Sequence, residues 1–173
     1  LRRGGSNLGS KPPAETVLLI LAALLVVAGT AVGALHVIAP LDLLDTAVGG
    51  ANFTFVVGAG ILGVGAGLHH WVDELTGPEG HRDGLILLGG LAIASGIVLS
   101  GMTDLISGLL DQTDFTGVTL AAAGNPNSGV DALNLVSMIG SFAVVGGLAT
   151  WMLAGGLVTA ANRTSGGEER GGS

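Results

Sequence analysis

The sequence predicts an all-α integral membrane protein, a bundle of four transmembrane helices with both termini in the cytoplasm. Three observations support this fold class. Four apolar segments are each long enough to cross a bilayer, charged residues make up only 11% of the 173 residues, and all basic residues fall on one side of the predicted spans. A soluble domain usually contains about 25% charged residues. The apolar segments are continuous rather than alternating, which excludes a transmembrane β-barrel.

Residues that interrupt helices bound the predicted spans. We expect the four spans near residues 16–38, 49–71, 84–103 and 131–160. Each provides the roughly 20 residues that a helix needs to cross the hydrocarbon core. The first follows Pro12 and Pro13 and ends before Pro40, and the last follows the turn sequence GNPNSG. The predicted domains are a cytoplasmic tail over 1–15, a transmembrane domain over 16–160 and a flexible C-terminal tail over 161–173.

The basic residues determine the predicted orientation. They precede the first span, lie between the second and third, and follow the fourth, at Arg2, Arg3, Lys11, Arg82, Arg163 and Arg170. The two remaining loops carry aspartates and contain no Lys or Arg. Because cytoplasmic loops of membrane proteins are enriched in Lys and Arg, both termini are predicted to lie in the cytoplasm of a multi-pass protein of the cell membrane.

Cysteine labelling tests this orientation. Since the chain contains no cysteine, single cysteines can be introduced one at a time. Leu43→Cys and Gln112→Cys should react with a membrane-impermeant thiol reagent in intact cells. Gly5→Cys and Gly167→Cys should react only after the membrane has been opened. Labelling of Gly5→Cys in intact cells would contradict the predicted topology.

Composition narrows the possible functions. The lack of cysteine excludes disulfides, zinc–thiolate sites and iron–sulfur clusters within the chain. A net charge of −7 with only six basic residues does not suit a nucleic-acid partner. The expected partners are the lipid bilayer and either other membrane subunits or further copies of the same chain.

Small residues predict where helices approach one another. Ala59, Gly63 and Gly67 are four residues apart and form a stripe on the second span. We interpret this stripe as a surface for close helix packing, because small residues let helix backbones approach in membranes. A ligand groove along the stripe is the alternative. In the fourth span, the residues expected to pack against neighbouring helices are Ser137, Gly140 and Ser141.

Three motifs resemble one family in order and spacing. They are APLDLLDT at 39–46 followed by Ala51 and Phe53, LSGM at 99–102, and NLVSMIGSF at 134–142. They resemble the runs PLD…HDT…AHFHYV, GLSGMPRR and N…S..GSF in helices nine to twelve of subunit I of heme-copper oxidases (cytochrome c oxidase). The resemblance covers roughly residues 17 to 160. It implies a segment of the subunit I bundle whose first and last helices begin and end in the cytoplasm, as the basic residues also predict.

This resemblance implies that heme ligation has been lost. The family's HFH run holds two heme-iron ligands on opposite faces of a helix, and Asn52 and Thr54 stand at those positions here. The arginines of GMPRR pair with heme propionates, and Asp104 and Leu105 stand in their places. Asparagine and threonine are not heme-iron ligands, which are His, Met, Cys or Tyr. No cofactor is therefore expected, and heme would be the cofactor if this interpretation were wrong.

Histidines at the ends of the spans are the remaining candidates for a metal or cofactor site. His36 ends the first span, and His69 and His70 precede Trp71 at the end of the second. We interpret all three as residues of the membrane interface, because they lie at the ends of spans and Trp71 is of a type enriched there. The alternatives are a heme or quinone ligand at His36, and a divalent metal held by His69 and His70 with nearby acidic residues and His81.

The sequence therefore predicts a hemeless protein, similar to subunit I, that serves as an accessory or structural subunit of a respiratory terminal oxidase. It would not be catalytic by itself. Two alternatives stay open. One is the C-terminal part of a catalytic subunit I encoded by a split gene. The other is a self-associating membrane protein, unrelated to respiration, that binds a hydrophobic ligand.

Overall fold

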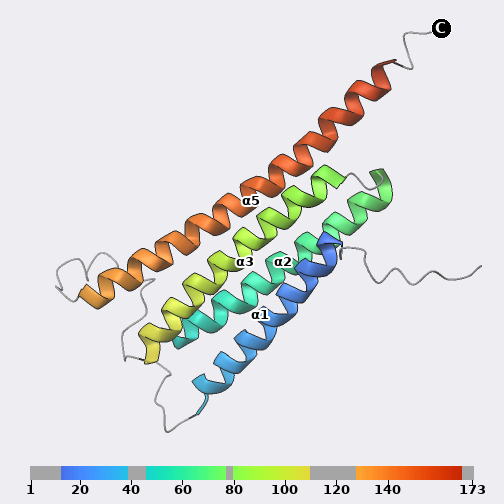
Figure 1. Ribbon diagram of the computed structural model, residues 1–173. Helices are drawn as coiled ribbons and strands as arrows, with labels where there is room; N and C mark the ends of the chain where they lie inside the picture. Colours follow the sequence, from blue (N-terminus) through green and yellow to red (C-terminus); the bar gives the residue numbers. More distant parts are fainter. Residues whose placement is uncertain (1–12, 39–45, 77–79, 110–127, 169–173) are drawn as a thin grey trace, which may run out of the picture.

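Four long helices make up the described part of the chain. The computed structural model describes residues 13–38, 46–76, 80–109 and 128–168. The helices are α1 (Ala14–His36), α2 (Val48–Thr76), α3 (Gly80–Leu109) and α5 (Ser128–Glu168). Figure 1 shows them lying side by side with their axes roughly aligned. This arrangement agrees with the predicted all-α bundle.

Each helix contains a segment that is long and apolar enough to cross a membrane. These segments are Ala14–Leu35, Val48–Val72, Asp83–Leu109 and Ala132–Gly155. They agree within a few residues with the predicted spans, except at the ends of the third and the last. The number of candidate spans is therefore confirmed, and the direction in which they cross stays a prediction. A chain with four such helices contacts lipid as a multi-pass membrane protein.

The ends of two helices reflect local sequence. The backbone N–H groups of Thr16 and Val17 both donate to the carbonyl oxygen of Pro13, so α1 starts directly after the proline pair. The helix α5 continues to Glu168, into the segment 161–173 that the sequence assigns to a flexible tail. No proline occurs in that segment to end the helix.

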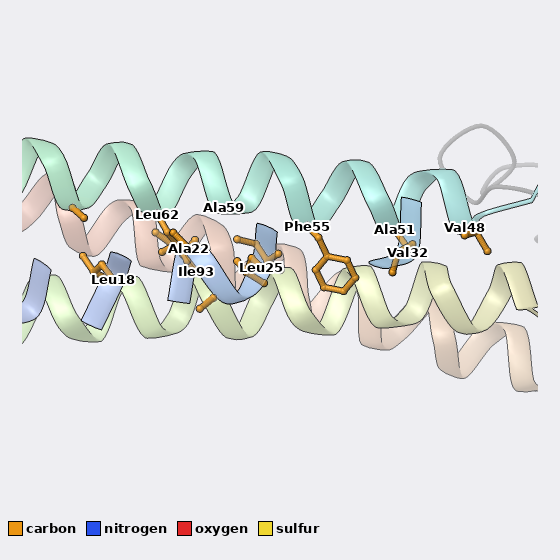
Figure 2. Packing of buried hydrophobic residues seen from close by; sticks show 13 residues of the cluster. Leu18, Ala22, Leu25, Val32, Val48, Ala51, Phe55, Ala59, Leu62 and Ile93 are labelled. Atoms are coloured by element: carbon orange, nitrogen blue, oxygen red, sulfur yellow. The ribbon is translucent and has the colours of Figure 1, made fainter. Parts of the chain in front are cut away.

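The core lies between α1, α2 and α3. Figure 2 shows Leu18 and Leu25 of α1, Phe55 and Leu62 of α2 and Ile93 of α3 within one apolar cluster. The buried positions on α2 include Ala51, Phe55, Ala59, Leu62 and Ala66. Their spacing of three and four residues keeps them on one helix face. This spacing of buried residues therefore defines the face of α2 that packs against α1 and α3.

Within the α2 stripe, Ala59 lies inside the bundle, whereas Gly63 and Gly67 contact no other helix among the described residues. Ala59 is buried, with 4% of its surface exposed. A Cβ atom at Gly63 or Gly67 would meet nothing within 4 Å among the described residues. The reason is geometric, because a step of four residues rotates about 40° past a full turn. Two such steps carry the stripe off the buried face.

Helices α3 and α5 approach through glycines seven residues apart. A Cβ atom at Gly96 would overlap the carbonyl oxygen of Gly140, and one at Gly89 would lie 2.9 Å from the carbonyl oxygen of Gly147. The pairing is antiparallel, since the earlier residue on α3 meets the later residue on α5. Only glycine leaves room for backbones at this distance.

The predicted packing residues of the fourth span lie at or beside this contact. Gly140 is buried against α3, and the Ser100 hydroxyl donates to the Ser137 carbonyl oxygen at 3.3 Å. Ser141 is exposed, and its hydroxyl donates to the same carbonyl oxygen from within its own helix at 3.1 Å. Gly140 and Ser137 therefore hold α5 on α3, while Ser141 lies at the edge of the contact.

Candidate functional site

Asn52 and Thr54 point from α2 toward different helices. A Cβ atom at Gly33 of α1 would lie 3.2 Å from Nδ2 of Asn52, so the glycine gives this amide room against α1. The Thr54 hydroxyl donates to Oδ2 of Asp104 on α3, at a long 3.5 Å. Positions two apart in a helix differ in direction by about 200°. The sequence NFT thus provides one polar contact to each neighbour of α2.

Close apolar packing surrounds these two polar contacts. Phe55 is 3% exposed, and a Cβ atom at Gly101 would lie 2.7 Å from its ring. In Figure 2 its side chain points from α2 into the space beside α3. One turn away, Gly58 of α2 makes room for Ile97 of α3 in the same manner. The interface between α2 and α3 is therefore filled by side chains on both sides of Thr54.

Asp104 is a half-buried carboxylate within the apolar segment Asp83–Leu109. It lies five residues before the end of α3, or about 8 Å along the helix axis. Carboxylates at this depth are costly unless they have polar partners, and Thr54 is one such partner. The adjacent Leu105 packs against the apolar core. The two positions thus serve different contacts, a polar one to α2 and an apolar one to the core.

A groove lies along α3 between α2 and α5. Its volume is about 380 Å³. Its walls are mostly apolar, with one hydroxyl from each of three helices, and are formed by Phe53, Thr54, Val57, Ile61, Ile97, Ser100, Ser141, Val144 and Val145. The described hydroxyls are already bonded, because Thr54 donates to Asp104 and both serines donate to the Ser137 carbonyl oxygen. The groove therefore offers an apolar surface rather than free polar groups.

Trp151 joins α5 to both α3 and α2. Its indole N–H donates to the carbonyl oxygen of Ile86 at 2.8 Å. A Cβ atom at Gly65 of α2 would overlap the ring, and one at Gly89 of α3 would lie 2.6 Å from it. The ring therefore fits only because both helices have glycine at these positions. Sequence reasoning missed this contact, although the need of a membrane tryptophan for an acceptor is a usable signal.

His69 and His70 connect the end of α2 to two different helices. Nε2 of His69 lies 3.3 Å from Oδ1 of Asp83 on α3, a distance that fits an ion pair when the imidazole is protonated. Nδ1 of His70 lies 3.2 Å from Oε2 of Glu15 on α1, and its Nε2 lies 3.8 Å from Oε1 of Glu74. His69 is buried and His70 is exposed. His69 is thus part of the contact between α2 and α3. His70 and Trp71 are exposed, as expected for residues at the membrane interface.

The histidines do not gather into a metal site in the described part of the chain. No group of three or more His, Asp or Glu side chains placed by the structure could hold a metal ion. The two imidazoles turn toward different helices, so they do not share one ligand sphere. The side chains of His36, Asp73 and His81 lie outside the described residues. The predictions that involve them therefore stay untested.

The chain matches no protein-family model, no curated protein and no solved structure.

Proposed function

We propose that this chain is a hemeless membrane protein, similar to oxidase subunit I, that acts as an accessory or structural subunit of a respiratory terminal oxidase. The observation that carries the proposal is that the side chains at positions 52 and 54 contact neighbouring helices. In the resembling family these positions ligate heme iron. Here Asn52 lies against Gly33 of α1 and Thr54 is bonded to Asp104 of α3. Two positions that hold heme ligands in that family thus make contacts between helices in this chain.

The donor groups near these positions do not fit heme. An amide and a hydroxyl are poor ligands for heme iron, which is held by His, Met, Cys or Tyr. Asp104 places a carboxylate where the family has an arginine, so it would repel a heme propionate. His69 and His70 lie at the far end of α2 and contact the carboxylates of Asp83 and Glu15. These features support a role in assembly rather than in electron transfer.

The exposed surface supports a role among other membrane subunits. Only 11% of the most apolar part of α5 is buried within the protein, compared with 39% for α3. Large apolar side chains on α5 remain exposed, among them Phe142, Met152 and Leu153. Lipid covers such surfaces in a single chain, and neighbouring helices replace lipid in a complex. A partner subunit would therefore find a broad surface on α5.

Purification in mild detergent tests the proposal. The chain should show no Soret band at stoichiometric heme, and oxidase subunits should be identified among the proteins that accompany it. A histidine-ligated heme spectrum from the chain itself would refute the hemeless proposal. Co-purification with one chain that supplies the first eight helices of a subunit I would instead support the split-gene alternative. Recovery of the chain alone or as a self-associated species would contradict the oxidase proposal.

The groove favours a second candidate function, the binding of a hydrophobic ligand. A cavity of about 380 Å³ lies within the range of roughly 300–1,000 Å³ that is common for ligand sites. It opens between α2 and α5 at the level of their apolar segments. The described hydroxyls are bonded within the chain. The fitting ligand is therefore a hydrocarbon chain, such as the acyl chain of a membrane lipid.

Filling the groove tests this second function. Ser141→Phe should occupy part of the groove and reduce the amount of lipid that stays bound in native mass spectrometry. Ser95→Phe is the matched control, because Ser95 is also exposed and its hydroxyl also donates to its own helix, at the Ala92 carbonyl oxygen. Equal lipid retention by both variants and the unmodified protein would contradict ligand binding in the groove.

A further inference from the structure

We draw no further inference here: the strongest candidate, the face of α2 formed by Gly60, Gly63 and Gly67, meets no other helix among the described residues, and nothing in the structure shows what covers it.

Discussion

Gly96→Leu is expected to separate α5 from α3 and to lower the free energy of unfolding by about 3 kcal/mol, the upper part of the range for overpacked cores. A Cβ atom at Gly96 would overlap the carbonyl oxygen of Gly140 and lie 2.9 Å from the backbone nitrogen of Val144. Backbone atoms cannot rotate away as a flexible side chain can. The helices must therefore move apart. Thermal unfolding in detergent measures the loss of stability.

Gly63→Leu is the matched control for this prediction. It introduces the same side chain at a glycine in the middle of α2, but a Cβ atom at Gly63 meets nothing within 4 Å among the residues that the structure describes. Its unfolding temperature should stay close to that of the unmodified protein when the chain is monomeric. Similar destabilisation by Gly63→Leu and Gly96→Leu would show that the contact between α3 and α5 is not the cause. A loss confined to an oligomer would place Gly63 at an interface between copies.

Trp151→Ala is expected to lower the free energy of unfolding by roughly 3 kcal/mol, at the low end of the range for aromatic truncation in soluble cores because lipid can refill the space. The variant loses the bond from the indole N–H to the Ile86 carbonyl oxygen and leaves the ring's place at Gly65 and Gly89 empty. Trp151→Phe should lower the free energy of unfolding by less, since most of the ring contact remains. Thermal unfolding of the two variants in the same detergent measures the difference.

The second tryptophan of the chain provides the control. Trp71 is 63% exposed on α2, so Trp71→Ala should change the unfolding temperature little. Trp71→Phe leaves Trp151 as the single tryptophan, whose fluorescence then reports the contact of α5 directly. In that background Gly96→Leu should alter the emission of Trp151 together with the loss of stability. An unchanged emission would contradict the separation of α5 from α3.

The sequence predicts some features of the candidate site and does not predict others. The opposed directions of Asn52 and Thr54 follow from helix geometry and are found in the structure, where they face α1 and α3. The partners of these side chains, Gly33 and Asp104, are 19 and 50 residues away in the sequence. No local pattern identifies them, because they depend on the order and rotation of the packed helices. His69 contacts α3 and His70 contacts α1, and these partners too depend on how the helices pack.

The sequence by itself determined that this chain forms four apolar helices, because length and hydropathy suffice to decide whether a segment crosses a bilayer. It also determined that glycine would allow close contacts between them. Gly140 was among the residues expected to pack, but only the tertiary structure decided that it meets Gly96 and which other glycines make such contacts. Gly63 and Gly67 match a four-residue stripe, yet Gly89, Gly96, Gly140 and Gly147 carry the contact. Lipid is as apolar as the helix surface, so hydropathy does not determine which face of a helix is buried. Close packing between the helix backbones determines it instead.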